Sequence, residues 1–272
     1  MQPCSLRRIS LNQKTTERWN VQEAVEGCVR ADVPWIALWR EKVAEAGLQS
    51  SKRLVRDAGL QVSSLCRGGM FPAATAAERA ARLDDNRRAV DEAAELWADV
   101  LVLVCGAAPD RDIGSARQWV KEGIAELAPY AKDRGITLGI EPLHPMYAAE
   151  RSVVVTLAQA LDLAEAYPAD EVGVIVDVFH VWWDPDLEAQ IARAGDRIKG
   201  FHVSDWIVPT PDLLMGRGMM GDGKIDIRGI RQLVETAGYG GPIEVEIFNQ
   251  IIWYTPGDIV LAQMKQRYVE HV

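Results

Sequence analysis

Short apolar runs alternate with longer amphipathic segments along this chain, and the alternation occurs eight times. Each run is mostly β-branched or aliphatic and lacks the apolar–polar alternation of a strand with one solvated face. Such runs are typical of parallel strands that are buried on both faces. The sequence therefore predicts eight strands, at Arg8–Leu11, Trp35–Trp39, Gln61–Leu65, Val100–Val104, Thr137–Ile140, Val174–Val176, Ile198–Val203 and Ile243–Ile247.

The segments between these runs have helical periodicity. Residues 115–134 end in a cation followed by Gly135, and residues 156–166 stop just before Pro168. A last helix is expected from about Asp258. The helix predicted over residues 76–97 places on one face Ala76, Ala80, Leu83, Val90, Ala94 and Trp97.

Eight strand–helix units in 272 residues fit one α/β fold, the (β/α)8 TIM barrel, which usually needs ~250 residues. The alternative is a doubly wound open sheet, but no Gly-x-Gly-x-x-Gly motif follows the first predicted strand. The chain also has no linker, no internal repeat and no low-complexity tract. We therefore predict a single barrel domain over residues 1–272.

Four successive predicted strands end in an ionisable residue, namely Glu141, Asp177, His202 and Glu246. In a barrel the carboxyl ends of the strands converge on one mouth. Three carboxylates brought together there would repel one another, and a divalent cation would relieve that repulsion. An oxygen-rich set with one imidazole suits Mn²⁺, Mg²⁺ or Co²⁺ better than a thiolate-type zinc site. Taken singly, each residue could equally be a helix cap or a loop anchor.

The motifs around these residues resemble a known family. "GIEPL", "DVFH", "HVSD", "GDGKIDI" and "EVEIF", in this order and spacing, are similar to the xylose isomerase-like TIM barrels, also called the sugar phosphate isomerase/epimerase superfamily. The stretch "DDNRRAVDEAAELWADVLVLVCG" extends the resemblance into the N-terminal half. The motifs identify the superfamily, which includes ketose 3-epimerases and inosose dehydratases, but they do not name a substrate.

The resemblance implies a set of roles. A divalent metal, most commonly Mn²⁺ with Mg²⁺, Co²⁺ or Zn²⁺ as alternatives, would be bound by Glu141, Asp177, His202 and Glu246. Glu141 and Glu246 would also move protons on opposite faces of the substrate, and His180 and Arg217 would contact its oxygens.

The implied activity is isomerisation or epimerisation of a keto sugar or keto polyol through a metal-stabilised enediolate. The alternative is a dehydratase or lyase, which loses a β-hydroxyl at the same site; inosose dehydration and elimination from 3-keto glycosides are examples.

Further candidates lie near the strand ends. His144 follows Glu141 by three residues and could contact the substrate. Asp205 follows His202 by three residues and could contact the substrate or orient the His202 imidazole. Trp182 could form a wall against a sugar ring. Each of the three could instead be a loop or packing residue. Glu244 shares a strand face with Glu246, and the register alone does not separate their roles.

Two more features leave alternatives open. Trp39, Arg40 and Arg67 follow the second and third strands, where arginines could bind a phosphate or carboxylate or form surface salt bridges. The long loop after His202 carries three methionines, Met215, Met219 and Met220. They indicate either a larger, less polar substrate or packing in the core.

Composition narrows the partners. With 30 basic against 39 acidic residues, a net charge of −9 and no basic stripe, the chain does not fit a nucleic-acid binder, and its few histidines argue against an endonuclease-type zinc cluster. No apolar stretch reaches the ~20 residues that span a bilayer. The absence of a signal peptide and the scattered cysteines Cys4, Cys28, Cys66 and Cys105 favour the cytoplasm. We expect a small-molecule sugar or polyol as partner, and the resemblance implies a homodimer or homotetramer.

Overall fold

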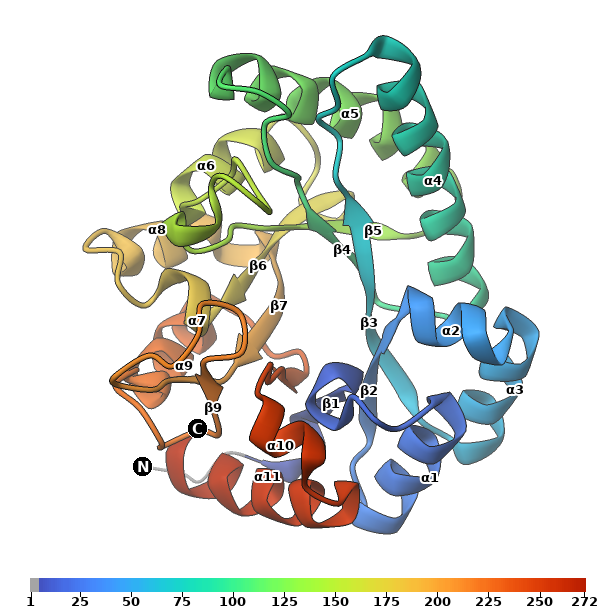
Figure 1. Ribbon diagram of the computed structural model, residues 1–272, viewed down its shortest axis with the longest axis vertical. Coiled ribbons are helices and arrows are strands. Elements are labelled where there is room, and N and C mark those ends of the chain that lie inside the picture. Colours follow the sequence, from blue (N-terminus) through green and yellow to red (C-terminus); the bar gives the residue numbers. More distant parts are fainter. Residues whose placement is uncertain (1–4) are drawn as a thin grey trace.

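The computed structural model describes residues 5–272, so Cys4 lies outside the described residues. Its centre is a closed barrel of parallel strands in the order β1-β10-β7-β6-β5-β4-β3-β2 (Figure 1). The first and last barrel strands pair with each other, with Ser10 opposite Glu244, and this pairing closes the barrel. The barrel strands are β1 Ile9–Asn12, β2 Trp35–Trp39, β3 Gln61–Gly69, β4 Val100–Val104, β5 Thr137–Glu141, β6 Val172–Asp177, β7 Ile198–Val203 and β10 Ile243–Val245.

Helices surround the barrel, and α11 lies beside α1 (Figure 1). The two ends of the described chain also meet, because the Tyr268 hydroxyl of α11 donates to the Ser5 carbonyl at 3.4 Å. Capping boxes at Asn20–Glu23 and Thr75–Glu78 begin α1 and α4. The α-helices are α1 Val21–Ala31, α2 Arg40–Ala46, α3 Leu48–Ala58, α4 Ala76–Glu95, α5 Ile113–Asp133, α6 Leu157–Ala164, α7 Val178–Val181, α8 Leu187–Ala194, α9 Ile227–Thr236, α10 Gln250–Tyr254 and α11 Gly257–His271. Short 3₁₀ turns cover Leu6–Arg8, Gln13–Thr16, Pro145–Tyr147 and Gly195–Arg197.

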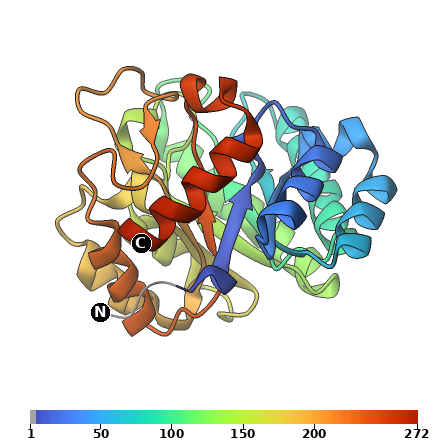
Figure 2. The same ribbon diagram turned by 90° about the horizontal axis from the view of Figure 1, so that it is seen from below.

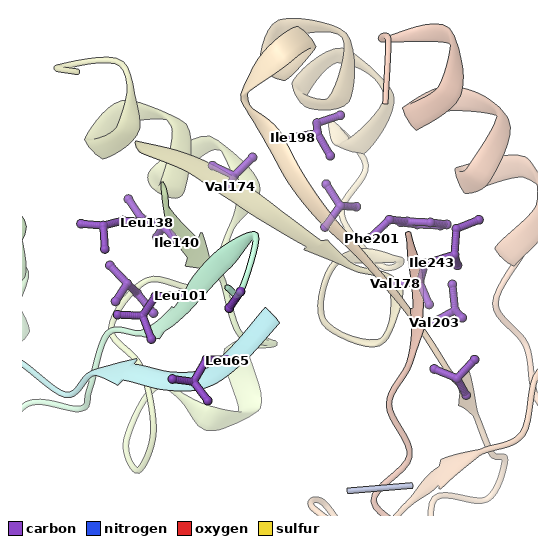
Figure 3. Packing of buried hydrophobic residues seen from close by; sticks show 14 of the residues in the cluster. Leu65, Leu101, Leu138, Ile140, Val174, Val178, Ile198, Phe201, Val203 and Ile243 are labelled. Carbon is purple, nitrogen blue, oxygen red and sulfur yellow. The ribbon is translucent and has the colours of Figure 1, made fainter. Parts of the chain in front are cut away.

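The main hydrophobic core lies between the strands and the helices. Aliphatic side chains such as Leu65, Leu101 and Val174 point outward from the barrel into this layer (Figure 3). Each is completely buried, and burying such a side chain contributes about 1.5–3 kcal/mol. The predicted burial of the strands on both faces is confirmed.

The inside of the barrel holds polar side chains as well as a small apolar cluster. Successive residues of each strand point outward and inward in turn, and the inward positions hold small or polar residues such as Ser10 and Gly139 together with a few apolar ones such as Val102 and Ile175. Ser10 Oγ lies 2.8 Å from Ser63 Oγ, although their strands β1 and β3 are not neighbours, so this contact crosses the interior. Ile175 fills space there because Gly139 and Gly200 lack side chains; a Cβ at either would lie 2.6 or 2.8 Å from its Cδ1.

The predicted face of the helix over residues 76–97 is wrong in part. The buried positions of α4 are Asn86, Ala89, Val90 and Ala93, while Ala76 and Ala80 are exposed. The face is shifted because Asn86 accepts the Gly69 N–H at 2.6 Å and donates to the Gly69 carbonyl at 2.7 Å. Trp97 lies beyond the helix end and is 54% exposed.

A long loop follows β7 and contains a small antiparallel ribbon, β8 Asp205–Trp206 with β9 Arg217–Gly218. This loop and α10 lie beyond the carboxyl ends of the barrel strands, the end toward which β1 points in Figure 2. Met219 and Met220 are buried in the main core, so for these two the packing alternative holds. Over residues 5–272, no helix combines the length and the apolar character needed to cross a bilayer.

Candidate metal centre

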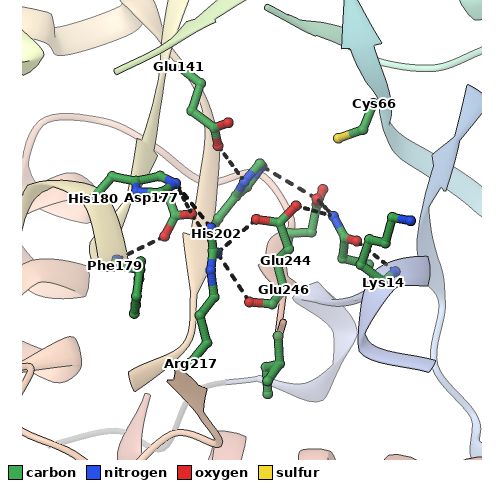
Figure 4. A network of polar contacts seen from close by, with 12 residues as sticks. Lys14, Cys66, Glu141, Asp177, Phe179, His180, His202, Arg217, Glu244 and Glu246 are labelled. Carbon is green, nitrogen blue, oxygen red and sulfur yellow. Dashed lines mark hydrogen bonds and ion pairs between the residues drawn. The ribbon is translucent and has the colours of Figure 1, made fainter. Parts of the chain in front are cut away.

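Four side chains converge at the carboxyl end of the barrel. Glu141 and Asp177 are the last residues of β5 and β6, His202 lies in β7, and Glu246 follows β10. Strand alternation turns all four inward, and all four are buried. One possible ligand atom from each lies within 4.8 Å of the others (Figure 4). The structure therefore brings together the four residues that the sequence predicts as metal ligands.

The chemistry of this cluster fits a divalent cation. Within residues 5–272, Glu141 Oε1 and both ring nitrogens of His202 are buried without a hydrogen-bond partner, and Nδ1 lies 3.2 Å from that carboxylate oxygen. Burial raises the pKa of Glu141 to about 7. Burial lowers the pKa of His202, but the neighbouring Glu244 and Glu141 carboxylates outweigh it and raise the pKa to about 10. Both raised pKa values favour the protonated forms, and a metal ion bound by these atoms would displace those protons.

Arg217 brings a permanent positive charge to the same cluster. It lies in β9, and its Nη1 donates to Asp177 Oδ2 at 2.9 Å and to Glu246 Oε2 at 2.8 Å. Burial lowers the pKa of Arg217, but these two carboxylates outweigh it and raise the pKa further above its usual value. The guanidinium therefore stays charged and compensates two of the three carboxylates.

His180 lies between Arg217 and the backbone of His144. The His144 N–H faces its Nδ1 at 3.2 Å, and Arg217 Nη2 faces its Nε2 at 3.0 Å. A second ring proton would face one of these two donors, and the nearest carboxylate oxygen, Asp177 Oδ2, lies 3.6 Å from Nε2, beyond hydrogen-bond distance. Burial and the Arg217 charge lower the pKa of His180 well below its usual value. His180 is therefore a neutral group at the edge of the cluster.

Glu244 lies one layer below Glu246 in the barrel. It accepts hydrogen bonds from Asn12 Nδ2 at 2.7 Å, Ser63 Oγ at 3.0 Å and Ser64 Oγ at 2.9 Å. Its Oε1 lies 3.5 Å from His202 Nε2. Glu244 thus faces the imidazole nitrogen that points away from Glu141, and it orients the ring from below.

Cys66 also lies near Glu244 and Glu246, and the three could in principle hold a second ion. Burial raises the pKa of the Cys66 thiol well above its usual value, so the thiol stays protonated. The oxygens of Glu244 are already occupied by three donors. These residues therefore fit a metal less well than the four-residue cluster.

A cavity with about 360 Å³ of empty space, part of it open to solvent, lies at the cluster. Of the predicted residues it is lined by Glu141, His180, Arg217 and Glu246. Trp39 and Arg67, expected only near the mouth, also line it. Other lining residues, which no sequence motif indicates, include Tyr147, Arg151 and Phe248.

Three predicted substrate-binding residues do not line this cavity. Trp182 packs against Trp206 with ring centroids 5.6 Å apart, and His144 lies 5.0 Å from the same ring while its Nδ1 accepts the Met146 N–H. The Asp205 carboxylate accepts four backbone N–H groups at 2.8–3.0 Å, those of Trp206, Gly221, Gly223 and Ile225. For Trp182 and Asp205 these contacts correspond to the packing and loop-anchoring alternatives.

Two curated relatives share part of this sequence. The 3-dehydroshikimate dehydratase of Pseudomonas aeruginosa is 29% identical over 203 residues, which are 73% of this chain and 31% of that enzyme. The inosose isomerase of Halalkalibacterium halodurans is 26% identical over 157 residues, 55% of this chain and 52% of that enzyme. The chain thus spans from about a third to half of the length of these relatives.

One solved structure is similar over nearly the whole chain. Protein SMc04130 of Sinorhizobium meliloti 1021 is 51% identical, with a TM-score of 0.96, and the match covers 98% of this chain and 99% of that one. The family model for the xylose isomerase-like TIM barrel matches residues 23–266. With its closed barrel and its cluster at the strand ends, this chain belongs to the xylose isomerase-like TIM barrel family.

Proposed function

We propose that this protein is a divalent-metal-dependent isomerase or epimerase that removes and returns a proton next to the carbonyl of a keto sugar or keto polyol. The observation that carries the proposal is the convergence of Glu141, Asp177, His202 and Glu246 at one end of the barrel. Mn²⁺ is the metal we expect, because the donor set is rich in carboxylate oxygens.

When bound, the ion supplies Lewis-acid stabilisation of the negative charge that develops on the substrate oxygens. The chain supplies the proton transfer. Glu141, with a pKa of about 7, can hold or release a proton near neutral pH. Glu246 comes from a strand that is not adjacent to β5, and it is held by Arg217 at 2.8 Å and Asn12 at 3.1 Å. Two carboxylates from separate strands can serve two faces of a substrate between them.

His180 and Arg217 position the substrate in this proposal. The neutral His180 ring lines the cavity beside Arg217 and adds no charge to it. Arg217 fixes the Glu246 carboxylate and faces the same cavity.

Dehydration is the second candidate function. It begins with the same proton removal and ends with loss of a β-hydroxyl, so the same carboxylates can perform it. The similarity to 3-dehydroshikimate dehydratase over 73% of this chain favours it, as the inosose isomerase favours isomerisation.

Proton exchange in D₂O, followed by NMR, tests both candidates. The panel is ketoses, inososes, 3-keto glycosides and 3-dehydroshikimate, each with Mn²⁺ and with EDTA. We expect Mn²⁺-dependent deuterium uptake at one carbon, lost in Glu246→Gln and retained in the matched surface variant Glu270→Gln. The products then separate isomerisation from elimination. Full exchange in EDTA, or in Glu246→Gln, would refute the mechanism.

The remaining proposals concern the protein's setting. The described cysteines are free and buried, namely Cys28, Cys66 and Cys105. This supports the proposal that the protein is located in a reducing compartment such as the cytoplasm. We retain a small-molecule partner, a single domain over residues 1–272 and a homodimer or homotetramer as predictions. Light scattering of the purified protein tests the oligomeric state.

A further inference from the structure

The arginines at the carboxyl end of the barrel include Arg40, Arg67, Arg151 and Arg217, and these four divide into two pairs. Arg217 is bound to Asp177 and Glu246, and Arg40 pairs with Asp85 at 2.9 Å and Glu92 at 2.6 Å. Among the described residues, no ion pair and no side-chain hydrogen bond satisfies the guanidinium of either of the other two, Arg67 and Arg151. Two arginines thus have acidic partners and two do not.

Both unpaired arginines face the cavity at the metal-ligand cluster. Arg67 and Arg151 line it together with Glu141 and Glu246. They come from different parts of the barrel, Arg67 from β3 and Arg151 from the segment between β5 and α6. The fold therefore brings two positive charges to one cavity from residues 84 positions apart in the chain.

The two guanidinium groups repel each other, and no carboxylate of residues 5–272 lies within ion-pair distance of either. Burial and the charge of Arg151 lower the pKa of Arg67. Glu41 is a carboxylate close enough to act on Arg67, but it already forms an ion pair with Lys14 at 2.7 Å. Arg151 has only the face of the Tyr147 ring, whose centroid lies 5.6 Å from its guanidinium carbon. An anion between the two guanidinium groups would remove their mutual repulsion and form charge-assisted hydrogen bonds.

We propose that Arg67 and Arg151 bind an anionic group of the substrate, a carboxylate or a phosphate, in the cavity that also holds Glu141 and Glu246. The inference rests on the proposed function, because it assumes that this cavity receives the substrate. It adds a class of substrate: keto compounds that carry an acid group, with neutral ketoses and inososes as poor ligands. The reacting end of such a substrate lies toward the carboxylate cluster and the acidic end toward the two arginines.

Binding measured by calorimetry tests the proposal without requiring turnover. The probes are shikimate as a cyclic carboxylate, D-fructose 6-phosphate as a phosphate, and methyl shikimate and D-fructose as their neutral counterparts. Each is titrated into the EDTA-treated and the Mn²⁺-supplemented protein. The variants are Arg67→Met, Arg151→Met and the charge-retaining Arg67→Lys. Arg53→Met serves as the matched control because Arg53 is an exposed arginine on α3, outside the cavity.

We expect at least one anionic probe to bind tenfold or more tightly than its neutral counterpart. Each Arg→Met change should weaken that probe by about tenfold or more, since a charge-assisted contact is lost. Arg67→Lys should restore part of the affinity, Arg53→Met should leave it unchanged, and the preferred probe identifies carboxylate or phosphate. The proposal is overturned if no anionic probe binds better than its neutral counterpart, or if the arginine variants weaken neutral and anionic probes alike.

The two proposals fail in different ways. Proton exchange on neutral keto sugars that Arg67→Met and Arg151→Met leave unchanged would retain the proposed function and reject the anion site. Arginine-dependent binding of shikimate or the sugar phosphate without proton exchange on any keto acid would retain the anion site and reject the enolisation.

Discussion

Replacing Arg217 by methionine tests how the buried charges of the site are balanced. The Arg217 guanidinium donates to Asp177 at 2.9 Å and to Glu246 at 2.8 Å, and all three residues are buried. Arg217→Met keeps much of the side-chain volume but leaves both carboxylates without this cation. Removing one partner of a buried ion pair costs about 3–5 kcal/mol. For a chain of this size, that corresponds to a fall in Tm of roughly 10 °C.

A bound divalent cation should reduce this loss, because it neutralises the same two carboxylates. We therefore expect Arg217→Met to lose about 3–5 kcal/mol of unfolding free energy in EDTA and less than half of that at saturating Mn²⁺. Urea unfolding under both conditions measures the two losses. The control is Arg231→Met, since Arg231 is also buried but lies on α9 and pairs with Glu235 at 3.7 Å. Its loss should be equal with and without the metal.

Equal losses for Arg217→Met in EDTA and in Mn²⁺ would refute this reasoning. That result would mean that the metal binds elsewhere, or that Arg217 stabilises the loop through packing and not through the two carboxylates.

Three further predictions concern the same end of the barrel. Glu244→Gln should weaken Mn²⁺ binding by about tenfold or more in calorimetry, because Glu244 orients the His202 ring from below, whereas Glu270→Gln should not. Mn²⁺ affinity should rise with pH between about 6 and 8. The pKa values of Glu141 (about 7) and His202 (about 10) are raised, so metal binding must displace protons from these groups. An affinity that is independent of pH, with no proton release, would contradict this. Because both pKa values are raised in the folded state, both groups stabilise the metal-free fold at low pH. Glu141 loses this contribution as pH rises through about 7, and His202 loses it as pH rises through about 10. Asp205→Ala should lower the free energy of unfolding in urea by on the order of 3 kcal/mol, because four backbone N–H groups lose their acceptor. The same change should expose the loop between β8 and β9 to proteases. An unchanged cleavage rate would show that the loop keeps its shape without this carboxylate.

The eight barrel strands could be located from the sequence because they are buried on both faces and form apolar runs. Their ends were harder to predict. The structure extends β3 to Gly69, four residues past the predicted end at Leu65, because Gly68 and Gly69 pair with β4 without having apolar side chains to indicate it.

The convergence of the four predicted ligands follows from the same logic. Equivalent strand ends meet at one mouth, so Glu141 and Asp177 come together with the others although they are 36 residues apart. The chemical role of the cluster stays a prediction that metal binding will test.

The rest of the cavity could not be predicted, because loops place it. Tyr147 lines the cavity, and its hydroxyl donates to the carbonyl of Leu213 in another loop. Periodicity carries no information about such a contact. The same limit explains Trp182, an aromatic residue near the mouth that packs against Trp206 and not into the cavity.

The pairing of β10 with β1 on one side and β7 on the other has a consequence for the protein during its synthesis. A chain emerging from the ribosome contains Glu141, Asp177 and His202 long before Glu246. Until β10 emerges, the barrel has an open edge and the cluster lacks one of its carboxylates. Closure of the barrel and completion of the cluster are thus the same late event. A truncated chain that stops before β10 would have neither, so binding of a metal by all four residues would report that the barrel has closed.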